Sequence, residues 1–349
     1  MHTTIMPTST MNSQPQPGRP ASMQGFDDMT PLSHVSIIAA VFLPVGVSII
    51  ACAIAIAKSF RGKRDLPSRI ASYIMMSSLG FGFVQVLHQI MVLTSANSDS
   101  ATTALAAAAF FFLVYVMLSQ LYLTLVTYLR IRWQVRLELG LFDWYLHLPC
   151  AATASILGLL FYSYDGLGAL GLLCLSSSSP NGYMVTLSIA VLALINSVAA
   201  LACRRSISAD LDEANIHVQT AESDFYQASS IFSTKSQDHT SFKANKSHLA
   251  QEPVLDSQTA RLRDRWIVQL NDMGISTRLA SMVTVSVFIF APIFVSSLAV
   301  SVVQGFGMVD LAANVLITVI LNSLAAGNAV GFLYSCRQAT RTVSDDDVA

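Results

Sequence analysis

The sequence predicts an all-α membrane protein in which seven transmembrane helices form one bundle. Its 349 residues are 53% hydrophobic and 12% charged, whereas an average soluble domain carries roughly 25% charged residues. Seven apolar runs are each long enough to cross a hydrocarbon core of roughly 30 Å as a helix of about 20 residues. Lys and Arg gather in alternate connections between these runs, which predicts an N-terminus outside the membrane and a C-terminus inside.

The first three spans are long apolar runs, expected at 34–57, 70–94 and 103–129. The third, TALAAAAFFFLVYVMLSQLYLTLVTYL, contains no charged residue. Because a charged side chain is costly at the centre of a bilayer, this run is the clearest of the seven.

The other four spans are expected at 144–164, 183–203, 279–303 and 311–335. His147 and Pro149 lie near the start of the first of these and make it the least regular. The last contains LNSLAAGNAVGFLYSCR, in which two Asn and one Ser interrupt the apolar residues. Backbone and side-chain polar groups in hydrocarbon must be paired inside the protein, so these residues are expected to face the interior of the bundle.

Charge determines the predicted orientation. Of the 20 Lys and Arg residues, all except Arg19 fall in or beside the first, third and fifth connections or in the C-terminal tail. The second, fourth and sixth connections contain none. Because cytoplasmic loops carry the excess of Lys and Arg, those three basic connections and the C-terminal tail are expected inside.

The connections divide the chain into five predicted segments. Residues 1–33 are rich in Pro, Ser and Thr, lack the apolar core of a signal peptide, and are expected to form a disordered extracellular tail. Residues 34–203 carry spans one to five, and 279–335 carry spans six and seven. The polar segment 204–278 is expected to be a mostly disordered cytoplasmic loop whose basic end has helical character, and 336–349 a short cytoplasmic tail.

Several functions need residue types that the predicted spans lack. A retinal protein needs a Lys in its last helix for the Schiff base, and no span core contains Lys. Proton and ion carriers usually place Asp or Glu within the bilayer, whereas His88 is the one deep ionisable residue here. His88 and His147 are expected near opposite membrane faces, which argues against a shared metal site. We therefore expect no enzyme activity, no metal and no cofactor.

Polar residues within the second and third spans define a candidate ligand site. A receptor needs an outer pocket, a middle with two arrangements and a basic inner face. Gln85 and Gln89 are spaced i,i+4 and share a helix face, with His88 beside it. The candidate ligand-binding residues are Gln85, His88, Gln89, Tyr115, Ser119 and Gln120. Interhelical hydrogen bonding, worth about 0.6–2 kcal/mol for each pair, is the alternative role. A structural or switching role is favoured for the span asparagines Asn196, Asn322 and Asn328.

The last span carries the first of three motifs that resemble a known receptor group. SLAAGNAVGFLYS, at 323–335, resembles the seventh helix of the cyclic-AMP-receptor-like G-protein-coupled receptors of slime moulds and fungi. Gly327, Asn328 and Tyr334 stand at the positions of that helix's glycine, asparagine and aromatic residue. Ala329 stands where the related motif of rhodopsin-like receptors has proline.

Two further stretches resemble the same group. KRDLPSRIASYIMMSSLGFGF, at 63–83, is similar to its basic first inner loop followed by Pro-Ser-Arg and a Tyr, and FDWYLHLPCAATASILGLL, with Tyr145 and His147, is similar to the start of its fourth helix. The sequence departs from the group at two places. The cysteine expected at the top of helix three is absent, which leaves Cys174 without a disulfide partner, and Arg130 lacks the acidic and Tyr neighbours usual at the inner end of that helix.

The resemblance implies a G-protein-coupled receptor of the plasma membrane that transduces an extracellular ligand or nutrient signal, with cyclic AMP signalling downstream. The implied partners are a heterotrimeric G protein, an extracellular small molecule or peptide, and membrane lipid, without nucleic acid. The residues expected to couple to the G protein are Arg69, Arg130, Arg204, Arg205, Arg265 and Arg278. The expected switch residues are Asn322, Asn328 and Tyr334. Cys336, at the membrane edge, is a candidate for lipidation. The alternative is a seven-helix transporter or a non-signalling membrane scaffold.

Overall fold

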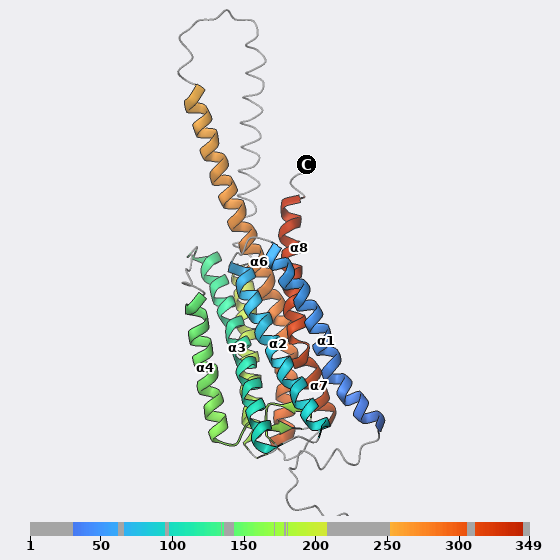
Figure 1. Ribbon diagram of the computed structural model, residues 1–349. Helices are drawn as coiled ribbons and strands as arrows, with labels where there is room; N and C mark the ends of the chain where they lie inside the picture. The colour runs from blue at the N-terminus through green and yellow to red at the C-terminus, as the bar shows by residue number, and fades with distance from the viewer. Residues whose placement is uncertain are drawn as a thin grey trace, which may run out of the picture.

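The structure is a bundle of long helices (Figure 1), which confirms the all-α class. It is a computed structural model that describes residues 31–61, 66–94, 98–133, 135, 143–170, 172–177, 179, 181–207, 252–305 and 311–344. The labelled helices are α1 (Pro31–Arg61), α2 (Leu66–Leu93), α3 (Asp99–Arg132), α4 (Trp144–Ser163), α6 (Glu252–Gly305), α7 (Leu311–Asn322) and α8 (Leu324–Ser344). A further helix spans Gly182–Ile207. Two short strands, β1 (Ala169–Leu170) and β2 (Leu173–Cys174), pair antiparallel.

Helix α3 lies at the centre of the bundle. It packs against α2 and α4 and also contacts α6. The helix Gly182–Ile207 contributes Ala200 and Cys203 to a small apolar cluster with Val283 of α6, against which Tyr128 of α3 packs. Helix α1 packs against α2, α7 and α8 (Figure 1). Helix α4 is the least buried of the candidate spans.

Six of the described helices are long and apolar enough to cross a membrane, and a seventh span results if the bent pair α7 and α8 is counted as one. Their outward faces carry large exposed hydrophobic side chains, such as Leu43, Phe83 and Phe288. Large exposed apolar surfaces of this kind mark contact with lipid or another protein. The chain therefore has the architecture of a multi-pass membrane protein.

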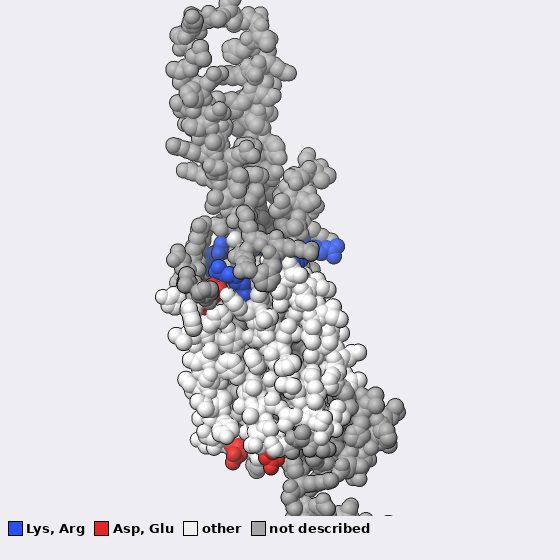
Figure 2. Space-filling view, in the orientation of Figure 1, with Lys and Arg blue, Asp and Glu red and all other residues white. Residues whose placement is uncertain are grey.

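The charged residues lie at the two ends of the bundle. Figure 2 shows Lys and Arg gathered at one end, which we call the basic end. The acidic residues Asp99, which begins α3, and Asp165, which follows α4, lie at the opposite end. The long faces between the two ends carry neither sign of charge in the view of Figure 2, as a hydrocarbon-spanning surface requires.

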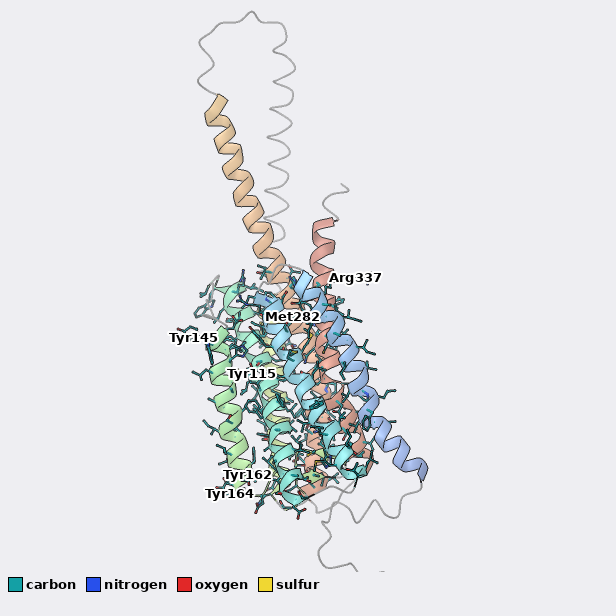
Figure 3. The ribbon with its side chains drawn as sticks, viewed as in Figure 1. Tyr115, Tyr145, Tyr162, Tyr164, Met282 and Arg337 are labelled. Atoms are coloured by element: carbon teal, nitrogen blue, oxygen red, sulfur yellow. The ribbon has the colours of Figure 1, made fainter. Side chains whose placement is uncertain are left out.

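Exposed aromatic residues mark both ends of α4. Tyr145 points outward near the basic end, and Tyr162 and Tyr164 point outward near the other end (Figure 3). Tyr and Trp are enriched at both membrane–water interfaces. The spacing of these rings along α4, roughly 25 Å at 1.5 Å per residue, is close to the thickness of a hydrocarbon core.

The last span, predicted as one helix over 311–335, is broken in the structure. Helices α7 and α8 meet at Ser323 with a bend of 41°. A break exposes backbone groups that a continuous helix would pair. Ser48 of α1 fills this need, because its Oγ donates to the Asn322 carbonyl at 3.0 Å and accepts from the Ala326 N–H at 3.3 Å. The predicted span is kept if the bent pair is counted as one, but the break itself was not predicted, because no Pro marks it and its partner lies on a distant helix.

Two helix ends also differ from the prediction. Helix α6 begins at Glu252, so the helical end expected in the segment 204–278 starts earlier than the sequence pattern indicated. The helix Gly182–Ile207 continues past its expected end and carries Arg204 and Arg205 in its last turns rather than in a loop. Most of the expected disordered tail and loop lies outside the described residues.

Ser48→Ala should lower the free energy of unfolding by about 1–2 kcal/mol, because the Asn322 carbonyl and the Ala326 N–H lose their shared partner inside the membrane. The reaction of a thiol-sensitive dye with the buried cysteines during heating in detergent reports the loss. Ser163→Ala is the matched control, since Ser163 is exposed and its hydroxyl donates to the Leu159 carbonyl of the same helix. Equal effects of the two substitutions would contradict a special role of Ser48.

Candidate functional site

A chain of side-chain hydrogen bonds crosses the centre of the bundle and joins four helices. Asn328 of α8 donates from Nδ2 to Ser78 Oγ of α2 at 3.3 Å. Gln120 of α3 donates from Nε2 to Asn328 Oδ1 at 2.8 Å. Ser286 of α6 donates to Gln120 Oε1 at 3.0 Å. All four side chains are buried. We call this set the central network.

Ser286 has two acceptors for one proton. Its hydroxyl lies 3.0 Å from Gln120 Oε1 and also 3.0 Å from the Met282 carbonyl of its own helix. A serine hydroxyl has one O–H to donate. Helix α6 is therefore able to separate from α3 without leaving Ser286 unpaired, because the proton then goes to the Met282 carbonyl. Gln120 would in that case lose an interhelical partner.

A short hairpin packs against α2 and α3 at the end of the bundle opposite the basic end. Gln85 Nε2 donates to the Cys174 carbonyl at 2.9 Å, and Gln85 Oε1 accepts from the Cys174 N–H at 3.1 Å. Gln89 Nε2 donates to the Leu172 carbonyl at 2.9 Å. The two glutamines thus hold the hairpin through its backbone, whereas the sequence predicted either ligand contact or hydrogen bonds between helices.

Several buried polar atoms have no hydrogen-bond partner in the part of the chain that the structure describes, and three of the side chains that carry them are His88, Ser297 and Asn322. Gln89 Nε2 lies 3.4 Å from His88 Nδ1. An amide NH2 only donates, so Nδ1 accepts and the ring proton lies on His88 Nε2, which meets no acceptor there. The side-chain amide of Asn322 and the hydroxyl of Ser297 are also buried and unmatched. Because buried polar atoms are normally paired with protein, water or a ligand, these groups are the places where a bound molecule would gain hydrogen bonds.

A second polar chain lies nearer the basic end and joins α2, α3 and α4. Arg69 forms an ion pair with Asp143 at 3.1 Å, and Tyr73 Oη donates to the other carboxylate oxygen at 3.2 Å. The Tyr73 ring packs edge-on against His147, with ring centroids 4.3 Å apart. Tyr115 hydrogen-bonds His147 Nδ1. Asp143 directly precedes α4 and is 2% exposed, so this pairing compensates a buried carboxylate.

Arg278 of α6 forms a clasp at the same end. Its guanidinium donates to Ser68 Oγ of α2 at 3.1 Å and to Cys336 Sγ of α8 at 3.3 Å. It also lies over the Phe332 ring, 5.8 Å from the centroid, in a cation–π geometry. The clasp ties α6 to α2 and α8 where the helices leave the bundle.

The structure does not gather the six candidate ligand residues at one place. Gln85 and Gln89 hold the hairpin, and His88 lies beside them. Tyr115 points to α4, with buried Ser119 next to it. Gln120 belongs to the central network together with Asn328, which the sequence analysis assigned to switching.

The predicted coupling and switch residues fall into distinct environments. Arg130 is at the end of α3, at the basic end with Arg204 and Arg205. Tyr334 is 52% exposed on α8, unlike the buried Asn328. Cys336 is partly buried against Arg278, and its lipidation stays a prediction. The side chain of Arg265 lies outside the described residues.

Sequence reasoning missed three residues of these networks. Asp143 was not singled out, although it directly precedes the apolar run of α4. Ser286 and Ser48 gave no signal, because serines are common in transmembrane helices and usually bond the preceding turn of their own helix.

Comparison with known proteins does not assign the chain to a family. No model of a protein family matches the chain, and no curated protein resembles it significantly in sequence. Among the described residues, no group of three or more His, Cys, Asp or Glu is placed to hold a metal ion.

Cys174 is the cysteine of the hairpin. Its thiol is fully buried, and burial raises its pKa from 9.0 to about 12. Burial in apolar surroundings disfavours the thiolate, the form that reacts with alkylating reagents.

Gln85→Leu should detach β2 from α2, so that the Cys174 thiol is alkylated at the rate of an ordinary exposed thiol. In the wild type, the thiolate fraction and hence the alkylation rate should keep rising with pH between about 7 and 10, since the pKa lies above this range. In Gln85→Leu the rate should be higher and should level off near pH 9. Mass spectrometry of the labelled peptide gives the rate, with Thr94→Val, at the exposed end of α2, as control. An unchanged profile in Gln85→Leu would show that the glutamine does not hold the hairpin.

Proposed function

We propose that this chain is a G-protein-coupled receptor of the plasma membrane that transduces an extracellular ligand or nutrient signal to a heterotrimeric G protein, with cyclic AMP signalling downstream. The observation that carries the proposal is the central network. It joins one residue from each of α2, α3, α6 and α8, so displacement of one helix changes the partners of the others. A receptor needs such an element between its two faces. The proposal includes neither catalysis nor a cofactor.

The proposed topology has seven spans, with α7 and α8 as one bent span. The gathering of Lys and Arg at one end supports a cytoplasmic location for that end. The hairpin and the start of α3 then face outward. This topology also places Arg69, Arg130, Arg204 and Arg205 where a G protein would meet them.

The proposed ligand reaches the bundle from the hairpin end. His88 Nε2 would donate to it, and the amide of Asn322 would both donate and accept. The described Lys and Arg side chains gather at the opposite end, so a phosphate-bearing ligand such as cyclic AMP would find no described cation near the hairpin. A neutral or cationic small molecule or peptide fits these groups better.

During signal transmission, two side chains of α6, Ser286 and Arg278, would change their hydrogen-bond partners. Movement of α6 would pass the Ser286 proton from Gln120 to the Met282 carbonyl. The same movement would open the clasp of Arg278 on Ser68 and Cys336. Interfaces of this kind have discrete arrangements, which suits a two-state element.

The deciding experiment is guanine-nucleotide exchange. The purified chain in lipid nanodiscs is mixed with candidate Gα subunits, with and without a library of small molecules and peptides. Accelerated exchange on one Gα would support the receptor. A folded chain that accelerates exchange on none of them would reject it.

Asn328→Leu should reduce exchange about fivefold or more while the chain still reaches the cell surface, because the two hydrogen bonds that link α8 to α2 and α3 are lost. Cell-surface labelling and nucleotide exchange are measured on the same samples. Asn196→Leu is the matched control, since Asn196 is buried but bonds the Leu192 carbonyl of its own helix. Equal exchange by the Asn328 variant and the wild type would remove the switching role.

Arg278→Gln should raise exchange in the absence of ligand, because opening the clasp frees the inner end of α6. Direct contact of Arg278 with the G protein, as expected from the sequence, predicts the opposite change in basal exchange. Basal exchange therefore separates the two roles. A rise supports the clasp, and a loss supports direct contact with the G protein.

A transporter is the second candidate, and the broken seventh span favours it. Helices interrupted near the bilayer midplane are typical of substrate and ion sites in transporters. In this chain, however, Ser48 pairs backbone groups on both sides of the break. Net flux of a substrate into proteoliposomes, without any effect on nucleotide exchange, would establish the transporter instead.

A further inference from the structure

Two glutamines of α2 bind the hairpin of β1 and β2 through its backbone. Gln85 pairs with both backbone groups of Cys174, since its Nε2 donates to the carbonyl at 2.9 Å and its Oε1 accepts from the N–H at 3.1 Å. Gln89 Nε2 donates to the Leu172 carbonyl at 2.9 Å. A side-chain amide carries a donor and an acceptor as a peptide group does, so Gln85 contacts the edge of β2 as a further strand would.

The spacing of the two glutamines matches an extended chain. Side chains at i and i+4 of a helix lie roughly 6 Å apart along its axis, at 1.5 Å per residue. Residues two apart in an extended segment lie roughly 6.6 Å apart, at 3.3 Å per residue. Gln85 and Gln89 are therefore placed to contact two carbonyls of one extended segment, here those of Cys174 and Leu172.

The side chains of the hairpin fill the end of the bundle where it lies. Leu170 and Leu173 are buried and belong to the core cluster that also contains Phe110 of α3 and Ile293 of α6. Residues 166–177 include no charged side chain. The surroundings of the two glutamines thus accommodate an extended, uncharged segment rich in leucine.

The hairpin also reaches α6. Gln304 of α6 accepts from Thr186 Oγ1 of the helix Gly182–Ile207 at 2.9 Å, and its Nε2 donates to Ser176 Oγ over a long 3.5 Å. Ser176 follows β2 by two residues and is fully buried. The hairpin therefore joins α2 to α6 at one end of the bundle, and the central network joins the same two helices at its centre.

We propose that Gln85 and Gln89 form a binding site for an extended, uncharged peptide, and that the hairpin is its built-in occupant, which holds α6 in place. A diffusible peptide would bind there by displacing β2. The site itself requires no G protein, whereas the effect of displacement on signalling rests on the proposed receptor function. In that receptor, the hairpin inhibits the chain that carries it.

A peptide with the hairpin's own sequence tests the site. It covers residues 169–176 with Ala at the cysteine, carries a fluorescent label, and is titrated onto the full chain in lipid nanodiscs. Leu173→Ser weakens the built-in occupant, because a hydroxyl replaces a buried apolar side chain, and leaves both glutamines in place. We expect the peptide to bind Leu173→Ser about hundredfold more tightly than the wild type, since a tethered occupant competes at an effective concentration in the mM range.

Two controls remove a glutamine contact and keep the apolar character of the peptide. The first is the same peptide N-methylated at the position of Cys174, which lacks the N–H that Gln85 Oε1 accepts. The second is the double variant Leu173→Ser with Gln85→Leu. Each should lower peptide binding about tenfold, because a buried polar group loses its partner. Unchanged binding in both controls would mean that the peptide dissolves in the lipid, and would overturn the site.

Hydrogen exchange tests the hold on α6. In Leu173→Ser, the backbone N–H groups of residues 297–304 should exchange about tenfold faster than in the wild type, because this end of α6 loses its link to the hairpin. Leu160→Ser is the matched control, since Leu160 is 47% exposed on α4. Elution volume and thermal unfolding identify variants that do not fold. Equal exchange in the two variants would overturn the hold.

One measurement needs no variant. In the wild type, the Cys174 N–H should exchange about hundredfold more slowly than a free peptide amide, because it is buried and bonded to Gln85. Exchange at the free rate would overturn the proposal.

Basal nucleotide exchange separates this proposal from the receptor function. A rise in Leu173→Ser supports the inhibitory role, and a responding Gα with unchanged basal exchange removes it. If no Gα responds while the peptide and the exchange of α6 behave as expected, the receptor function fails and the peptide site stands.

Discussion

Hydrocarbon offers no hydrogen-bond partner, and most of the notable contacts in this bundle follow from that constraint. Ser48 pairs the backbone where the last span breaks. The side chain of Asn328 hydrogen-bonds to Ser78 of α2 and to Gln120 of α3. The hairpin near the surface follows the same rule. Its two strands have two residues each and leave some backbone N–H and C=O groups without a strand partner, and Gln85 and Gln89 hydrogen-bond to such groups. These polar contacts join helices within a large core of buried apolar side chains.

The same constraint explains how much of the structure the sequence predicted. The all-α class and the places of the apolar runs follow from lipid solvation, which acts on each segment separately. The need of Asn322 and Asn328 for partners was predictable, since an amide in an apolar run has no local solution. The identity of the partners of Asn328 was not, because Ser78 and Gln120 lie far from it in the chain and the packing of the helices brings them together. The side-chain amide of Asn322 meets no partner among the described residues. The break at Ser323 was missed for the same reason, as its compensation comes from α1.

The candidate site combines tight and exchangeable contacts. The ion pair of Arg69 with buried Asp143 joins α2 to the start of α4, and separating it would leave a buried charge. The contacts of α6 are of a different kind, because Ser286 has an alternative acceptor and Arg278 is tied to a hydroxyl and a thiol. Displacement of α6 would therefore leave the Ser286 hydroxyl paired, whereas separation of Arg69 from Asp143 would leave a buried carboxylate without its cation. A division between contacts that persist and contacts that exchange partners suits a bundle with two arrangements.

The length of α6 gives this division a mechanical consequence. The helix has 54 residues, and its first part, over 252–274, projects beyond the basic end of the bundle (Figure 1). That part is roughly 35 Å long at 1.5 Å per residue, so a tilt of about 5° at the clasp moves its tip by about 3 Å. A change of one hydrogen bond in the membrane is thereby amplified into a displacement the size of a side chain outside it. In the proposed receptor, the projecting helix would act as a lever arm with its fulcrum at Arg278.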